Sequence, residues 1–157
     1  MRTFRLRVIS ADMNCTFAFE YEFSRDGDDF GWLMAHVQAP NFSRRNGMWV
    51  QWEALVDFSA SLARYPIEAE KPIACEWGFS ENGKYTAVTK LKVSPEGSTG
   101  GLAASVLLAN YDKPEDRCQA RFQTNYPSLL QFQHEIDRMM REKVGVAILT
   151  GRNVTVR

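Results

Sequence analysis

Strict alternation of apolar and polar residues is the dominant pattern along this chain, and it predicts β-strands because successive side chains of a strand point to opposite faces. Residues 16–23 show it best: four aromatic residues share one face, while Thr16, Ala18, Glu20 and Glu22 share the other. The same reasoning predicts strands over 3–9, 30–39, 72–79, 85–93, 102–110 and 117–124, and a short strand or strand pair within 146–149 and 153–156.

Two segments change from a period of 2 to a period of 3.6, which predicts two helices. After an expected loop over 41–47, a helix is predicted from about Met48 to the residue before Pro66, because proline ends it. Its apolar face consists of Trp49, Trp52, Leu55, Val56, Ser59, Leu62 and Ala63. A second helix is predicted to open at 125–128, where Asn or Ser can act as the cap. Its apolar face consists of Leu129, Phe132, Gln133, Ile136, Met139 and Met140.

Short connections between the predicted strands favour antiparallel meanders, because sequential strands with short links usually pair. Residues 11–14 and 25–29 contain the Asp, Asn or Gly that turns prefer, and Asn82-Gly83 is among the strongest hairpin signals. Seven to eight strands with two helices therefore predict an α+β fold in which a curved antiparallel sheet carries both helices. The length of 157 residues fits a single domain over 1–157.

Composition narrows the class of protein. Hydrophobic residues make up 45% of the chain and charged residues 24%, which is typical of a globular domain and not of a disordered one. No stretch approaches the roughly 20 apolar residues of a membrane-spanning helix, and residues 1–10 lack the apolar run of a signal peptide. Cys15, Cys75 and Cys118 are an odd, widely spaced set, so neither a disulfide framework nor a zinc site is predicted. We expect a cytoplasmic protein with reduced thiols.

The residues that could support catalysis or metal binding do not form a recognised constellation. His36 lies in a strand pattern and His134 on the polar side of the second helix, and neither has a second ligand at metal-binding spacing. Glu20 and Glu22 share one strand face, which is more typical of solvent exposure than of general acid and base catalysis. The Asp26–Asp29 turn begins like a calcium loop but lacks the glycine and the closing glutamate. No catalytic residue, metal or cofactor is predicted.

Charge and aromatic residues favour a protein partner. Nineteen basic side chains balance nineteen acidic ones, so neither a nucleic acid nor a membrane surface is expected to bind. The acids nevertheless gather in the turn at 26–29 and two bases follow a phenylalanine at 42, near a tryptophan that can act as an anchor. The leading hypothesis is a non-enzymatic protein-binding domain whose contact residues are Phe42, Arg44, Arg45, Trp49, Asp26, Asp28 and Asp29. An uncapped sheet edge would also allow a homodimer.

Two other functions stay open. In the first, the curved sheet and a helix enclose an aromatic-lined pocket for a small molecule. Its lining residues would be Phe17, Phe19, Trp32, Trp77 and Tyr85. In the second, the protein is an enzyme that uses Glu20, Glu22 or His36.

The order of elements over about residues 30–140 resembles that of a small bacterial group of domains similar to the WapI-type immunity proteins. In those proteins a strand, a W-x-x-W/L-x-x-F helix, an antiparallel meander and a final L-x-x-F helix recur. Trp49, Trp52, Leu55 and Phe58 match the first helix pattern, and Leu129 and Phe132 match the second. The resemblance implies a domain that acts by binding, for instance by covering a partner protein, and it carries over no catalytic residue.

Overall fold

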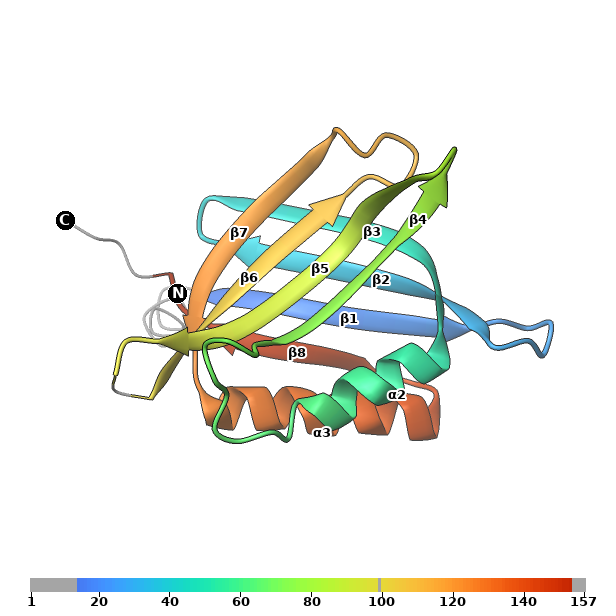
Figure 1. Ribbon diagram of the computed structural model, residues 1–157. Helices are drawn as coiled ribbons and strands as arrows, with labels where there is room; N and C mark the ends of the chain where they lie inside the picture. The colour runs from blue at the N-terminus through green and yellow to red at the C-terminus, as the bar shows by residue number, and fades with distance from the viewer. Residues whose placement is uncertain (1–13, 99, 154–157) are drawn as a thin grey trace, which may run out of the picture.

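The computed structural model describes residues 14–98 and 100–153 and shows an α+β fold with eight strands and two helices (Figure 1). The predicted strand at 3–9, most of its hairpin and the end of the predicted tail strand lie outside these residues. The elements are β1 (Cys15–Phe23), β2 (Phe30–Ala39), β3 (Phe42–Gln51), α2 (Trp52–Ser61), β4 (Ile73–Glu81), β5 (Lys84–Glu96), β6 (Gly101–Ala109), β7 (Arg117–Thr124), α3 (Tyr126–Glu142) and β8 (Val146–Gly151). Neither helix has the length and apolar character needed to cross a bilayer within the part of the chain described.

The strands divide into two four-stranded antiparallel sheets. The first sheet has the order β3-β2-β1-β8, and the second has the order β4-β5-β6-β7. The second sheet is the predicted meander, whereas in the first sheet β8 pairs with β1, with Cys15 opposite Gly151. Figure 1 shows the second sheet in front of the first with their strands crossing, and both helices along one side of the pair. The predicted fold class is confirmed, with the strands shared between two layers that do not close into a barrel.

The segment 41–51 corrects the sequence analysis, because it forms a strand and not a loop followed by a helix. β3 pairs with the whole of β2, from Phe42 opposite Ala39 to Gln51 opposite Phe30. Its backbone groups are thereby satisfied by a ladder that a helix starting at Met48 would break. Helix α2 begins only at Trp52, so Trp49 lies on a strand.

Both helices place a narrow apolar face against the core. In α2 the buried residues are Leu55, Phe58 and Ser59, whereas Val56, predicted on the same face, is exposed. In α3 the predicted cap is confirmed, since the Asn125 side chain accepts a hydrogen bond of 2.8 Å from the Ser128 backbone N–H. The buried residues of α3 are Leu129, Phe132, Ile136 and Met139.

An aromatic cluster fills the space between the sheets and the helices. Phe17 and Phe19 of β1 are fully buried, and Phe19 lies 5.9 Å from Trp77 of β4 and 5.8 Å from Phe132 of α3 between ring centroids. Phe58 of α2 packs edge-on against Phe19 at 6.4 Å. Because these rings come from four elements, burial of this cluster holds the two layers and the helices together.

A buried asparagine joins the two sheets away from the helices. The Asn46 side-chain amide on β3 donates to the backbone oxygens of Val88 and Ala109, each at 3.0 Å, and lies 3.0 Å from the Thr89 hydroxyl. Val88 and Ala109 belong to β5 and β6, so one side chain of the first sheet contacts two strands of the second. Its own Oδ1 has no hydrogen-bond partner in the described structure.

Helix α3 covers the outer edge of β8. The Glu135 carboxylate accepts a 2.7 Å hydrogen bond from the backbone N–H of Ile148, and the Thr150 hydroxyl lies 3.2 Å from that of Ser128. Just beyond β8, Gln123 of β7 and Arg152 exchange two backbone hydrogen bonds of 2.9 Å. These contacts satisfy edge groups that could otherwise pair with another strand.

Candidate functional site

The face of the first sheet that points away from the core is the candidate site, and we call it the outer face. Its side chains form rows across β3, β2 and β1, as the strand register shows. One row contains Trp49, Trp32 and Glu22, and the next contains Gly47, Met34 and Glu20. The helices pack on the opposite face, because Phe132 contacts the inward rings of β1.

The most prominent feature of the outer face is a tryptophan pair. Trp49 is 53% exposed and packs edge-on against Trp32, with 5.2 Å between ring centroids. The Trp32 indole N–H points at the Met34 sulfur, 3.1 Å away. A Cβ at Gly47 would overlap the Trp32 ring, so glycine leaves the space in which that ring lies against the sheet. Trp32 is therefore held in place and supports an exposed aromatic side chain of the kind that anchors protein interfaces.

Carboxylates border the tryptophan pair. Glu22 lies in the same row as Trp32, and the β1–β2 turn begins directly after β1. The Asp28 carboxylate accepts a 3.0 Å hydrogen bond from the Phe30 N–H, and the Asp29 carbonyl accepts one of 3.0 Å from the N–H of Trp52. The turn is thus fixed to β2 and to the start of α2. The exposed acids at this end of the outer face are Glu20, Glu22, Asp26, Asp28 and Asp29.

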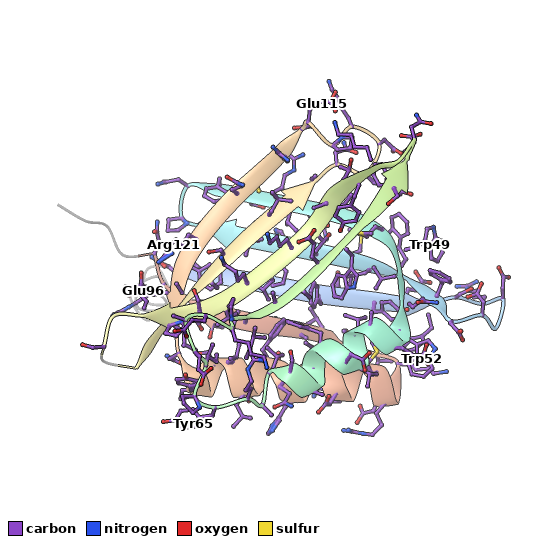
Figure 2. The ribbon with its side chains drawn as sticks, in the orientation of Figure 1. Trp49, Trp52, Tyr65, Glu96, Glu115 and Arg121 are labelled. Carbon is purple, nitrogen blue, oxygen red and sulfur yellow. The ribbon has the colours of Figure 1, made fainter. Side chains whose placement is uncertain are left out.

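The residues predicted to bind a partner protein do not form one patch. Trp49 lies at the same end of β3 as the acidic turn, and Figure 2 shows it near Trp52 at the start of α2. Arg45 shares the outer face but lies next to His36, nearer the other end of the strand. The alternation of β3 directs Arg44 to the opposite side, where it forms a 3.2 Å ion pair with Asp116. Phe42 lies on that side as well.

The residues predicted to line a ligand pocket lie in three different places. Phe17, Phe19 and Trp77 belong to the aromatic cluster of the core, where protein side chains occupy the space. Trp32 lies on the outer face, on the other side of the first sheet. Tyr85 is 50% exposed on β5 beside the β4–β5 hairpin. These five side chains therefore do not surround a common cavity.

The candidate acid and base residues share the outer face but form no described contact with one another. Glu20 and Glu22 are exposed, and Glu22 lies 3.8 Å from Arg25. His36 lies one strand away and contacts the Ser43 hydroxyl at 3.0 Å. An open sheet surface does not exclude water as most catalytic sites do. Within residues 14–98 and 100–153, no group of three His, Cys, Asp or Glu side chains is placed to hold a metal ion.

The thiols are poor nucleophiles because of where the strands place them. Burial raises the pKa of the Cys75 thiol to about 12. Burial also raises the pKa values of Cys15 and Cys118, although Arg44 and a backbone hydrogen bond oppose the shift at Cys118. Since the thiolate is the reactive form, all three should react slowly near neutral pH.

We expect Cys75 to resist alkylation by iodoacetamide in the native protein at pH 8, where its thiol stays protonated. Cys118 is only half-buried, and its alkylation should increase first as the pH is raised toward 9 or above. Mass spectrometry of digested samples measures each site, and the same reaction in denaturant serves as the control in which all three sites react. Equal native rates at Cys75 and Cys118 would contradict the burial argument.

Comparison with known proteins assigns no function to the outer face. No protein-family model matches the chain, and no curated protein or solved structure matches it either. Sequence analysis also missed two contributors to the site, Met34 and Gly47. Alternation across 43–51 was the signal that could have revealed Gly47, because it places Gly47 on the same face as Trp49.

Proposed function

We propose that this chain is a non-enzymatic binding domain that docks a partner protein on the outer face at Trp49. The observation that carries the proposal is an exposed tryptophan supported by a second, fixed tryptophan on an open sheet face. A large aromatic side chain of this kind supplies contact area at low entropic cost, as interface anchors do.

The acids beside Trp49 specify the chemistry of the partner. Five exposed carboxylates lie on the outer face or in its adjoining turn, with only Arg25 and Arg45 as nearby bases. Such an arrangement favours a protein that presents an apolar pocket bordered by lysine or arginine. It disfavours nucleic acids and anionic membranes, whose phosphates these carboxylates would repel.

An immunity-like role in the bacterial cytoplasm extends the proposal. The resemblance to the WapI-type immunity proteins supports a domain that inhibits a partner by covering its surface. Its first helix pattern is divided here, since Trp49 lies on β3 while Leu55 and Phe58 face the core from α2. Trp49 is therefore available for contact where the other two residues are not. The free cysteines agree with a reducing compartment.

The test uses the purified chain as bait in extract from its native host at low salt, followed by affinity measurement with the identified partner. Trp49→Ser should weaken binding at least tenfold, while Tyr85→Ser, which removes an equally exposed aromatic residue from the other sheet, should change it less than twofold. Binding should also weaken as salt is added.

Two results would overturn the proposal. One is failure to recover any stoichiometric protein at low salt, and the other is a partner that binds Trp49→Ser and the native chain equally. Light scattering of the bait alone shows whether a second copy of the chain occupies the surface instead. In that case Trp49→Ser should convert the dimer to a monomer, and the proposal of a different partner protein would be rejected.

A further inference from the structure

A second surface feature lies on the other layer of the molecule. A hollow of about 390 Å³ opens over β5, β6 and β7, on the side of the second sheet that points away from the core. Its lining residues are Lys90, Lys92, Ser105, Val106, Leu107, Gln119, Ala120 and Arg121. None of them belongs to the outer face of the first sheet, so the hollow is separate from the surface around Trp49.

Strand register places two cations on either side of a small hydroxyl residue. Ser105 of β6 lies opposite Lys92 of β5 and opposite Arg121 of β7. Neighbouring strands are about 4.8 Å apart, so the backbones of the two basic residues are separated by roughly 10 Å. Serine leaves open the space between their long side chains, and both can reach a group seated above its hydroxyl.

The adjacent row adds an apolar floor and further donors. Leu107 lies between Lys90 and Gln119 in the same register. The hollow therefore has donors around its rim and apolar surface from Leu107 and Ala120 beneath part of it. This combination suits a ligand with an anionic end and an organic body.

The charges of the hollow leave one cation without an acid. Lys90 pairs with Glu76 at 3.7 Å, and Arg121 pairs with Glu96 at 2.7 Å, as their positions in Figure 2 allow the reader to follow for the second pair. Lys92 forms no ion pair with the described residues. The Glu96 contact uses one Arg121 nitrogen and orients the guanidinium, which keeps further N–H groups for a ligand.

We infer that this hollow binds the phosphate group of a small phosphorylated molecule, held by Lys92, Arg121 and the Ser105 hydroxyl. A tetrahedral phosphate dianion can accept hydrogen bonds from several directions at once, whereas a planar carboxylate has two oxygens and one charge. The donors here approach from both neighbouring strands and from below. Leu107 and Ala120 would contact the organic part of the ligand.

The test titrates the isotope-labelled chain with phenyl phosphate, inorganic phosphate and benzoate at constant ionic strength and follows backbone amide shifts. Phenyl phosphate should give saturable shifts confined to residues 90–92, 105–107 and 119–121, and it should bind more tightly than either of the other probes. Lys92→Gln should weaken phenyl phosphate binding at least fivefold. Lys84→Gln removes an exposed lysine at the start of β5 and should leave the affinity unchanged.

Shifts that never saturate, or an affinity that Lys92→Gln does not alter, would overturn the inference. Equal affinity for benzoate and phenyl phosphate would reject the preference for phosphate. Trp49→Ser should bind phenyl phosphate as the native chain does, since the two surfaces share no residue. Failure at one surface therefore leaves the other proposal intact.

Discussion

Replacing Asn46 by aspartate should lower the free energy of unfolding by roughly 3–5 kcal/mol, the cost typical of an unpaired buried charge. The native amide donates to the backbone oxygens of Val88 and Ala109 on two strands of the second sheet. A carboxylate has no N–H to donate, and its oxygens would face those carbonyl oxygens in a buried position. The free energy of unfolding, measured by urea titration at pH 7, gives the size of the loss.

The matched control for this substitution is Asn82→Asp. Asn82 is exposed in the β4–β5 turn at a φ of 55°, a conformation that aspartate also tolerates, and we expect a change within about 0.5 kcal/mol. The loss at Asn46 should shrink in acid, because protonation of the introduced carboxyl removes its charge and restores a donor. A loss below about 1 kcal/mol at pH 7 would show that the two sheets do not depend on this contact.

Phe19→Ala should cost a similar amount, roughly 3–5 kcal/mol, because a cavity would form where the ring is now enclosed. The Phe19 ring is fully buried and lies within 6.4 Å of four other ring centroids, which come from both sheets and both helices. Trp77 is one of these neighbours, so its fluorescence should report the loosened packing together with the urea midpoint.

The control for Phe19 is Phe30→Ala, which removes the same side chain from a position that is 41% exposed at the start of β2. Exposed substitutions usually change stability little, and we expect a loss below about 1 kcal/mol. Equal losses at the two positions would contradict the assignment of Phe19 to the centre of the core.

The strands were predictable where local signals agreed with one another. Residues 16–23 alternate without exception, and Asn82 and Gly83 have the positive φ values, 55° and 76°, that a tight hairpin turn requires. Helix α3 was predictable for the same reason, since its cap at Asn125 and its apolar period point to the same start.

The segment 41–52 was predicted wrongly because two periods compete there. Trp49 and Trp52 have helical spacing, yet Met48 and Val50 also alternate with Gly47 and Trp49 as in a strand. Pairing along the whole of β2 decides in favour of the strand, and this contact lies outside any local window of sequence. The division into two sheets was hidden for a similar reason, because a burial pattern tells which residues face inward but not which layer covers them.

The same limit applies to the candidate site. Sequence analysis placed Trp49 and the acidic turn among the contact residues, and the structure brings them to one end of the first sheet. Sequence neighbours such as Arg44 and Arg45 were assigned together, although adjacent strand residues point to opposite faces. Phe17 and Trp32 were assigned to one pocket because sequence shows their chemistry but not the side of the sheet on which each lies.

The pairing of β1 with β8 has a consequence for biosynthesis. Residues 73–124 form a meander of sequential hairpins, so the second sheet can assemble as soon as that stretch has left the ribosome. The first sheet must wait, because the partner of Cys15 is Gly151. Contacts this distant in sequence form slowly, and meanwhile the free edge of β1 is open to strands of other nascent chains. Production of the native protein should therefore be most sensitive to chaperone supply during the last stage of translation.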